Sequence, residues 1–507
     1  MTYAETYLAT LKRHAERLSD KACYVDDSEK WTYADLWSKV TASANCLREA
    51  GLRPGDHVIL DASNVKEFLY IYPSAHLAGA TVTPLDPNTP KVKIEALFER
   101  FKNAGQPVRY IPPQASDLPE TFLSIGAIKE QVEQSQGAVS DSLDLPTPDQ
   151  VADIVFTSGA TGQPKGVLLT HGAQIAAVDN INRFGGATSD DIELVLMPLC
   201  HSFGLGRMRC ILSAGGTLVL ADGVARLKPV FKAFKNLGVT GFGLVPSAWT
   251  LLRRSTGDKL AEFADQIKYL EFGSAYMSSE VKSDIQTLLP KTDVFMHYGL
   301  TECSRAVFLS FKNDDTHLDS VGKAAPLTEL AVLDEHGEPC PDGEAGEICV
   351  KGPMQMLGYW QDDDATKSGM HGDWVRTGDL GHIDEDGYLY LKGRAKELIN
   401  VGGRKVSPVE VDAVVSALPC IEECACVGIA DPDNITGEAI VACVIPKPGA
   451  DLPDDRELLE LMKSSLEFYK LPKTFIVVND IPKTPTGKIQ RLALADRVTH
   501  ILSEGDA

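Results

Sequence analysis

The stretch TSGATGQPKGV, residues 157–167, decides how the rest of this sequence is interpreted. It follows directly on the apolar run VADIVF, residues 151–156, which predicts a buried strand that ends in a flexible loop. The glycines of the loop let the backbone approach a ligand closely, and Lys165 supplies one positive charge. Hydroxyl donors are offered by Thr157, Ser158 and Thr161. This combination predicts a cradle for a chain of phosphates.

Two other interpretations of this loop have to be compared. The Walker pattern GxxxxGK[ST] is absent, because the lysine is followed by Gly166. A solvated turn with a surface lysine has a similar composition, and it is the better interpretation of such a loop taken alone. The phosphate cradle therefore depends on what the remaining motifs add.

Composition and charge restrict the class of protein. A chain of 507 residues with 44% hydrophobic residues is too long for one ordinary core and predicts at least two domains. Its net charge of -22 argues against nucleic acid or an anionic membrane as the main partner. We find no signal peptide and no apolar stretch long enough to span a bilayer, and so expect no integral membrane segment and a cytoplasmic protein. The 11 scattered cysteines predict reduced, mostly buried thiols.

The order of elements predicts an α/β fold. Short apolar runs that end in glycine-rich or polar loops alternate with helix-like segments such as residues 224–238, which implies layers of parallel strands and helices. After about residue 330 the sequence becomes rich in turns and hairpins, which predicts a β subdomain. Ser407, with Pro408 at the first helical position and Glu410 after it, then begins a compact α+β unit of about 110 residues.

Three further motifs carry groups that a nucleotide with a metal ion requires. HYGLTE, residues 297–302, offers a flat ring, a hydroxyl and a carboxylate at the end of a predicted strand. WVRTGD, residues 374–379, together with Gly393 and Arg394, brings a carboxylate and a guanidinium. PKTPTGK, residues 482–488, places a lysine on a stiff loop near the C-terminus. For each charged group taken alone, a surface side chain is the plain alternative.

Five motifs occur in a fixed order along the chain: TSGATGQPKG, YGLTE, RTGDLG, GRAKELINVGGRKVSP and PKTPTGKIQR. By these motifs the chain resembles the adenylate-forming superfamily of acyl-CoA synthetases, peptide-synthetase adenylation domains and firefly-type luciferases. The resemblance spans roughly residues 25–492. It implies a large N-terminal domain, residues 1–395, of layered α/β subdomains plus the β subdomain. A small mobile α+β domain, residues 396–507, would carry the adenylation lysine.

The resemblance also implies the reaction and its cofactors. ATP would activate a carboxylic acid to an acyl adenylate with release of pyrophosphate, and the thiol of CoA would then take the acyl group. Ser158, Thr161 and Lys165 would grip the phosphates, and Thr301 would touch the α-phosphate. Glu302 would hold Mg²⁺. Adenosine would be held by the segment Gly273, Ser274, Ala275 and Tyr276, by Tyr298 on the base, and by Asp379 on the ribose with Arg394 beside it.

For the C-terminal domain the resemblance implies movement between the two half-reactions. Lys488 would stabilise the charge that develops in the first transition state, because carboxylate and phosphate repel each other. Lys396 would be the hinge. Gly402 and Gly403 would shape the path of the thiol in the second step, although Gly-Gly before Arg-Lys is also ordinary turn composition.

Several positions leave alternatives open. Ala160 stands where the family usually has serine or threonine, so one phosphate contact is lost. His201 either lies near the acyl pocket and the thiol channel or is a packed structural residue. Arg207, Arg209 and Arg305 can recognise a second acidic or polar group, which suggests a dicarboxylate or hydroxy acid. The alternative is that they face solvent or pair with some of the 71 acids, and for Arg209 we expect this alternative.

Three other functions compete with the CoA ligase. The same adenylate can be delivered to the phosphopantetheine arm of a free-standing acyl carrier protein. A luciferase-type oxygenase would consume oxygen and emit light. A degenerate nucleotide-binding protein would have no need of Lys488, and the presence of Glu302 and Asp379 argues against it too.

Overall fold

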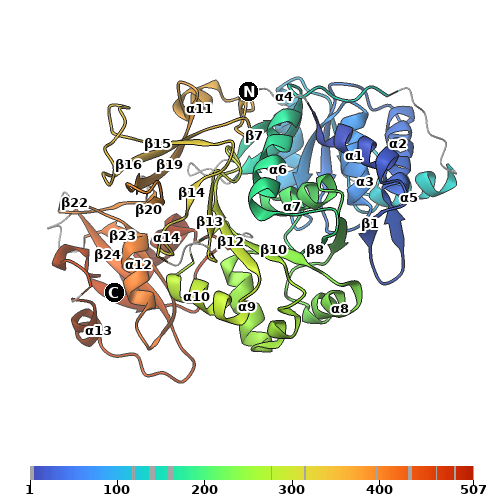
Figure 1. Ribbon diagram of the computed structural model, residues 1–507. Coiled ribbons are helices and arrows are strands. Elements are labelled where there is room, and N and C mark those ends of the chain that lie inside the picture. The colour runs from blue at the N-terminus through green and yellow to red at the C-terminus, as the bar shows by residue number, and fades with distance from the viewer. Residues whose placement is uncertain are drawn as a thin grey trace.

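The computed structural model describes most of the chain and places it in four connected parts (Figure 1). The described residues are 5–116, 118, 120–135, 143–157, 164–275, 277–312, 316–394, 397–402, 404–431, 437–463, 465–484 and 487–505. Two large sheets with helices between and outside them form the bulk of the molecule. A β subdomain and a C-terminal α+β unit, orange to red in Figure 1, lie at one side.

The first sheet carries the loop that opened the sequence. Its six strands have the order β17-β7-β6-β4-β3-β5, in which β3, β4, β5 and β6 run parallel and β7 and β17 are antiparallel to their neighbours. The strands are β3 (His57–Asp61), β4 (Thr81–Leu85), β5 (Val108–Ile111), β6 (Val151–Thr157), β7 (Lys165–Thr170) and β17 (Gly358–Tyr359). Helix α4 (Lys91–Asn103) covers the outer face through a cluster that includes Phe98 and Phe101.

The second sheet has nine strands in the order β14-β13-β12-β11-β10-β8-β9-β1-β2. These are β1 (Ala22–Val25), β2 (Lys30–Thr32), β8 (Ile192–Val195), β9 (Thr217–Leu220), β10 (Gly241–Leu244), β11 (Tyr269–Phe272), β12 (Asp293–Tyr298), β13 (Val307–Ser310) and β14 (Lys323–Ala324). Its central strands are parallel, as the alternation of strands and helices predicts, and its ends are antiparallel.

Helices fill the space between the two sheets and cover the far face of the second one. One buried cluster joins both sheets through apolar side chains of α1, α2, α3, α5 and α7, and α6 packs on α7. The helices are α1 (Tyr7–Arg17), α2 (Tyr33–Glu49), α3 (Phe68–Leu77), α5 (Ile125–Gln134), α6 (His171–Gly185) and α7 (Ser202–Ser213). The far face is covered by α8 (Leu227–Leu237), α9 (Pro246–Thr256), η1 (Lys259–Phe263) and α10 (Ser279–Leu288).

The turn-rich sequence after residue 330 forms the predicted β subdomain. Strands β15, β16, β19, β18 and β20 make an antiparallel sheet. They are β15 (Glu329–Leu333), β16 (Gly346–Lys351), β18 (Met370–His371), β19 (Trp374–Ile383) and β20 (Leu389–Arg394), with the short helix α11 (Asp363–Ser368) beside them.

The C-terminal unit has its own two cores, one on each face of a three-stranded sheet. Its elements are β21 (Ile399–Val401), β22 (Arg404–Val406), α12 (Pro408–Ser416), β23 (Ile421–Ala430), β24 (Glu438–Pro446), α13 (Asp455–Met462), η2 (Phe468–Lys470), β25 (Thr474–Val477) and α14 (Arg491–Gly505). Ser407 caps α12 by accepting a hydrogen bond from the Glu410 amide, as predicted. The predicted boundary at residues 395 and 396 lies outside the described residues.

Two sequence expectations about the whole chain can be compared with this structure. All 11 cysteines are free thiols and nine of them are buried, which agrees with the expected reduced state. Cys424 and Cys426 lie on strand β23 in the core, as their apolar context predicts. No helix within the described part of the chain is long and apolar enough to cross a membrane.

Candidate active site

The hairpin of β6 and β7 carries the ends of the predicted phosphate loop. Thr157 is the last residue of β6 and Lys165 the first residue of β7, and the two are paired across the hairpin. Both side chains are half-buried. Ser158, Ala160 and Thr161, which the sequence places in this loop, lie outside the described residues. The structure therefore fixes the base of the loop and the position of its lysine.

Tyr359, which the sequence motifs did not single out, joins the loop lysine to the predicted metal ligand. Strand β17 pairs with β7 so that Tyr359 lies opposite Val167. The Tyr359 ring then lies under Lys165, with Nζ 4.8 Å from the ring centroid, and its hydroxyl donates a hydrogen bond of 2.8 Å to Glu302 Oε1. The Glu302 carboxylate and the Lys165 ammonium, which are far apart in the sequence, thus both contact the side chain of Tyr359.

The loop that bears Thr301 and Glu302 is held from two sides. The Met356 amide donates to the Glu302 carbonyl at 2.8 Å, just before strand β17. At Gly299 the loop turns back so tightly that a Cβ atom would lie 2.6 Å from the Arg305 amide nitrogen. Glycine is therefore required within the YGLTE motif for a structural reason.

The predicted adenine segment follows β11. Gly273 is covered by the imidazole of His297, since a Cβ there would lie 2.1 Å from a ring carbon of that histidine. Ser274 has a φ of 72°, an uncommon conformation for a residue with a side chain, and Ala275 is half-buried. Backbone strain of this kind clusters at ligand sites. Tyr276 lies outside the described residues.

Tyr298 and Asp379 are brought together from the second sheet and the β subdomain. The Tyr298 hydroxyl donates to Asp379 Oδ2 at 2.6 Å, and Asp379 is only 7% exposed. In the β19–β20 ladder the backbone of Asp379 is paired with that of Arg394, so the two parts of this motif are adjacent. The sequence motifs at 298, 379 and 394 therefore meet in space.

The loop of Lys488 lies against the N-terminal part of the chain. Gly487 has a φ of 80°, and a Cβ there would lie 2.7 Å from Ser247 Oγ at the start of α9. An ion pair of 2.6 Å between Arg254 and Glu422 joins the same helix to the C-terminal unit. Gly402 also has a positive φ, 59°, whereas Lys396 and Gly403 lie outside the described residues.

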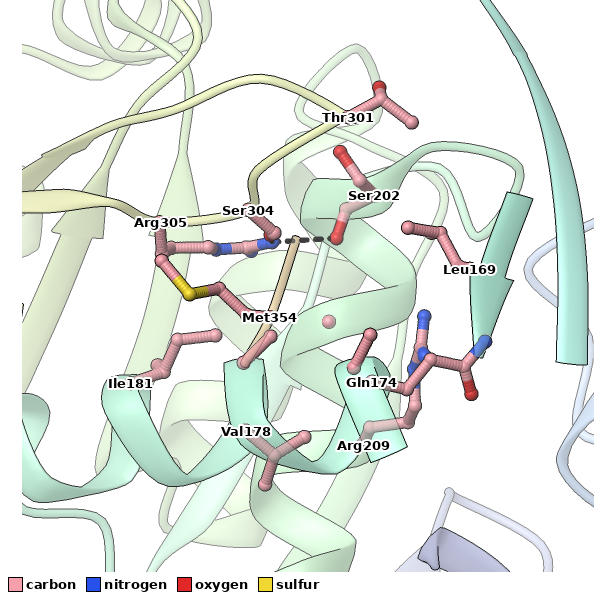
Figure 2. Close-up of a pocket in the computed structure, with 13 residues that line it drawn as sticks. Leu169, Gln174, Val178, Ile181, Ser202, Arg209, Thr301, Ser304, Arg305 and Met354 are labelled. Carbon is pink, nitrogen blue, oxygen red and sulfur yellow. Dashed lines mark hydrogen bonds between the residues drawn. The ribbon is translucent and has the colours of Figure 1, made fainter. Parts of the chain in front are cut away.

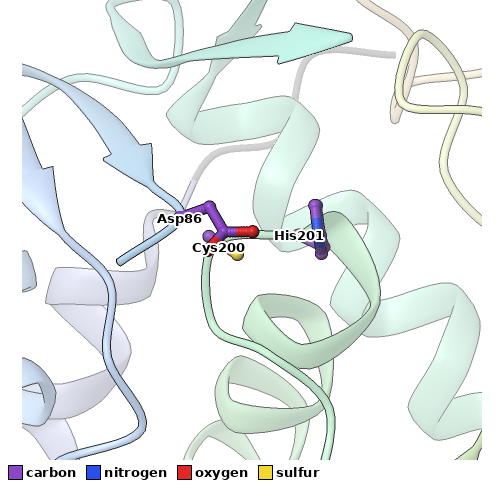
Figure 3. Close-up of side chains that lie close together, drawn as sticks. All are labelled: Asp86, Cys200 and His201. Carbon is purple, nitrogen blue, oxygen red and sulfur yellow. The ribbon is translucent and has the colours of Figure 1, made fainter. Parts of the chain in front are cut away.

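His201 lies at the N-terminus of α7 in a small polar group (Figure 3). One ligand-type atom each of His201, Asp86 and Cys200 lie within 4.8 Å of one another. The imidazole Nε2 is buried without a hydrogen-bond partner among the described residues, and burial lowers the pKa of this histidine. Burial also raises the pKa of Cys200 to about 12, which opposes the thiolate that a metal ligand requires. We therefore assign no metal to this group.

Two of the three arginines that we considered for the acid pocket bind groups of the protein itself. Arg207 forms ion pairs with Glu193 and Glu271, and all three side chains are buried. Arg305 donates to the carbonyls of Ser202 at 2.7 Å and Phe203 at 3.0 Å. The side chains of Arg207 and Arg305 thus hold the protein together, and this describes their geometry better than recognition of the substrate.

The charges of this cluster offset one another. Burial alone would raise the pKa of Glu271, but Arg207, His297 and Arg305 hold it well below its ordinary value. Burial lowers the pKa of His297, whose Nδ1 lies 2.6 Å from Glu271 Oε1. Two cations and two carboxylates remain beside a neutral imidazole. Removing one member would leave a buried charge unpaired, at a cost of about 3–5 kcal/mol.

Arg209 behaves differently from the other two arginines. It is only 5% exposed, so of the two alternatives to substrate recognition that we gave, facing solvent is excluded, and it lines a cavity that Thr301 also lines (Figure 2). It forms a long ion pair of 4.0 Å with the buried Asp153, which agrees with the other alternative, pairing with an acid. The sequence did not indicate the cavity, because periodicity alone does not show which face of a helix meets one.

Taken together, the structure describes these parts of the predicted nucleotide site: the hairpin that carries Lys165, the Glu302 carboxylate, the strained segment at Ser274, the pair of Tyr298 and Asp379, and the Gly487 loop of the C-terminal unit. The sequence profile of the AMP-binding enzyme family matches residues 11–360, and that of the AMP-binding enzyme C-terminal domain matches residues 410–488. The chain belongs to this family of adenylate-forming enzymes and is an AMP-forming acid–thiol ligase.

Relatives and solved structures match nearly the whole chain. An oxalate–CoA ligase of Arabidopsis thaliana is 30% identical over 97% of this chain and 98% of its own. A feruloyl-CoA synthase of an Amycolatopsis species is 31% identical over 90% and 92%. The crystal structure of ATP-bound MatB from Rhodopseudomonas palustris matches with a TM-score of 0.86 at 26% identity over 98% and 100% of the two chains, and the apo form of MatB with 0.76. The arrangement described here is thus nearer to the ATP-bound form.

Proposed function

We propose that this protein uses ATP to convert a carboxylic acid to an acyl adenylate and then transfers the acyl group to the thiol of CoA. The observation that supports this proposal is the shared contact of Lys165 and Glu302 with Tyr359, because it would offer the phosphate chain of ATP both a cation and a metal ligand. The Lys488 loop, which lies against α9, would add the lysine that adenylation requires.

In the first step a carboxylate oxygen attacks the α-phosphorus and pyrophosphate leaves. Attack of one anion on another is opposed by charge repulsion, which Lys165 at the phosphates and Lys488 at the reacting carboxylate would offset. Thr301 would donate a hydrogen bond to the α-phosphate. Lys488→Ala would then impair this step and leave the second one intact.

The half-buried carboxylate of Glu302 fits Mg²⁺, which takes one or two carboxylates together with substrate phosphates. The Tyr359 hydroxyl occupies one side of Oε1 and orients the carboxylate, whose remaining lone pairs are left for the ion. When bound, Mg²⁺ would neutralise charge on the phosphates of ATP.

Adenosine would lie between the 273–276 segment and the pair Tyr298 and Asp379. The Asp379 carboxylate can accept hydrogen bonds from both ribose hydroxyls, and the Tyr298 hydroxyl fixes its orientation. The Tyr298 ring would offer its face to the base, with Arg394 beside the ribose.

In the second step the C-terminal domain, residues 396–507, would turn about Lys396 so that the loop of Gly402 and Gly403 replaces the Lys488 loop. One ion pair that must break for this movement is weak. The Arg254 side chain of the Arg254–Glu422 pair is 57% exposed, and such pairs contribute at most about 1 kcal/mol. His201 would lie along the path of the thiol.

CoA is the acceptor that we propose, since both relatives described above are named as CoA ligases or synthases. Their names also cover a small diacid and an aryl acid at nearly equal identity, so relatedness alone does not choose the acid. The cytoplasmic location stays a prediction.

The proposal is tested by incubating the protein with ATP, Mg²⁺ and a mixture of dicarboxylic, hydroxy, fatty and aromatic acids, with and without CoA. Mass spectrometry would report AMP, acyl adenylates and acyl thioesters. We expect AMP and a CoA thioester in equal amounts. Adenylate that accumulates in the presence of CoA would instead indicate a carrier protein as acceptor, and light or oxygen uptake an oxygenase.

A further inference from the structure

The cavity beside Thr301 lies between α6, α7 and the loop after YGLTE (Figure 2). Its walls are mainly apolar, from side chains of Leu169, Ala177, Val178, Ile181 and Met354. Ser202, Ser304 and the guanidinium of Arg209 add polar groups, and in Figure 2 the nitrogens of Arg209 lie beside Gln174. Because Thr301 is the residue that we place at the α-phosphate, an acid held in this cavity would point its reacting carboxylate toward that end.

The size of the cavity limits the acid. Its volume is about 30 Å³, the space of two or three ordered water molecules. A cavity that takes benzene measures about 150 Å³. The space therefore suits a group of carboxylate size on a short chain, and an aromatic ring or a long alkyl chain exceeds it several-fold.

Arg209 has unused hydrogen-bonding capacity. Among the described residues its guanidinium makes one hydrogen bond, from Nε to the Leu205 carbonyl at 3.3 Å. Asp153, at 4.0 Å, lies beyond hydrogen-bond distance from it. A guanidinium has five N–H donors, so four of them are left.

Asp153 itself is satisfied by closer donors. It accepts hydrogen bonds from the Tyr72 hydroxyl at 2.8 Å and from Gln174 Nε2 at 2.6 Å, and His76 Nε2 lies 3.1 Å from its other oxygen. The remaining N–H groups of the Arg209 guanidinium are therefore available to a ligand. A planar fork of this kind suits a carboxylate, which it binds through two parallel hydrogen bonds.

We propose that the acid substrate is a short dicarboxylate, of about two to four carbons, whose far carboxylate binds Arg209 while its near carboxylate reacts at Thr301. This inference rests on the proposed function and adds its substrate class. A buried arginine at the end of a small apolar cavity favours a second anionic group there and disfavours an uncharged methyl end, which would leave four N–H donors of the guanidinium without acceptors.

The test compares matched acids and variants of Arg209. AMP release with CoA present would be measured for oxalate, malonate and succinate, and for acetate, propanoate, butanoate, hexanoate and benzoate. We expect kcat/KM for the best dicarboxylate to exceed that of the monocarboxylate of equal length by at least about 10-fold. Arg209→Met, which keeps length and removes charge, should lower this ratio by about 10- to 100-fold through the KM of the diacid.

Two further variants separate recognition from structure. Arg209→Lys keeps the charge without the fork, so it should raise the KM of the diacid while the KM of ATP stays constant. Arg183→Met is the matched control, because Arg183 is on α6, half-exposed and paired with Asp179. Arg183→Met should change neither the KM of the diacid nor the KM of ATP.

The outcomes distinguish the inference from the function that it extends. A diacid preference that Arg209→Met and Arg209→Lys both reduce would support it. Preference for hexanoate or benzoate, or a diacid preference that neither variant changes, would overturn it while AMP release still upheld the ligase. Absence of AMP with every acid would overturn the proposed function, and the inference with it.

Discussion

The hydroxyl of Tyr298 and the carboxylate of Asp379, on strands of two different sheets, lie 2.6 Å apart. Tyr298 ends β12 of the nine-stranded sheet, and Asp379 lies in β19 of the β subdomain. A hydrogen bond between a hydroxyl and a carboxylate is short and strong, so it fixes the ring and the acid together. The base and the ribose of a bound nucleotide would accordingly be held by one unit of two residues.

The coupling of these two residues can be measured. Asp379→Asn should raise the KM of ATP by about 10-fold, because a charge-assisted hydrogen bond contributes about 1.5–3 kcal/mol. Tyr298→Phe should raise it less. The double variant should fall short of the sum of the two effects by about 1 kcal/mol, since the residues share one interaction. Strict additivity of the two effects on ATP binding would contradict a shared site.

Tyr359→Phe tests the link between Lys165 and Glu302. The ring under Lys165 remains and only the hydroxyl to Glu302 is lost, so the carboxylate loses its orientation. We expect the Mg²⁺ concentration for half-maximal AMP release to rise several-fold, with the KM of the acid unchanged.

Tyr24→Phe is the matched control, because Tyr24 donates a similar 2.8 Å hydrogen bond to Asp26 away from the site. It should leave the Mg²⁺ requirement as it is. An equal rise in both variants would show that the effect comes from general loss of a hydroxyl and would remove the role we give to Tyr359.

Lys488→Ala should separate the two half-reactions. Loss of a group that stabilises charge in a transition state costs about 10²- to 10³-fold in rate, and we expect at least 10² in adenylation. Conversion of a supplied acyl adenylate to its CoA thioester should continue at nearly the normal rate. Single-turnover measurements of both steps would check this, and equal loss in both would contradict a lysine that serves the first step alone.

The stability of the first sheet should depend on pH through His57. Burial lowers the pKa of this histidine to about 3, below the ordinary value near 6.5. The folded state then binds fewer protons than the unfolded state, so the stabilisation is complete above pH 6.5. It is lost by up to ~1.4 kcal/mol per pH unit as the pH falls toward 3.

His57→Gln removes this titration and keeps a donor for Thr83, which lies 2.9 Å from His57 Nε2. The fall in urea midpoint between pH 7.5 and pH 5.0 should therefore be smaller in the variant than in the parent protein. An unchanged fall would show that other groups, such as buried His171, dominate the acid sensitivity.

Local sequence rules predicted much of the fold. Thr32 and Asp35 form a capping box at the start of α2, and Gly238 ends α8 in a left-handed conformation. Such features depend on neighbours within a few residues, which a single sequence displays. The β subdomain and the α+β unit were recognised for the same reason.

Contacts between distant segments were harder to predict. Tyr359 meets Glu302 only because β17 adds to the edge of β7, and a two-residue strand has no recognisable period. Arg207 and Arg209 are two positions apart on α7, so they face different sides of the helix, one toward Glu271 and the other toward the cavity. The sequence showed the arginines, whereas the packing of α6 and α7 assigned their surroundings.

The central claim, activation through an acyl adenylate, is tested most directly by isotope transfer. The protein would be incubated with ATP, Mg²⁺, CoA and a substrate acid labelled with ¹⁸O in its carboxylate. Mass spectrometry would then measure the ¹⁸O content of the products. The carboxylate oxygen that attacks the α-phosphorus stays with it when the thiol displaces the acyl group, so we predict one ¹⁸O in AMP and none in pyrophosphate. Label in inorganic phosphate or pyrophosphate, with AMP unlabelled, would contradict an adenylate intermediate.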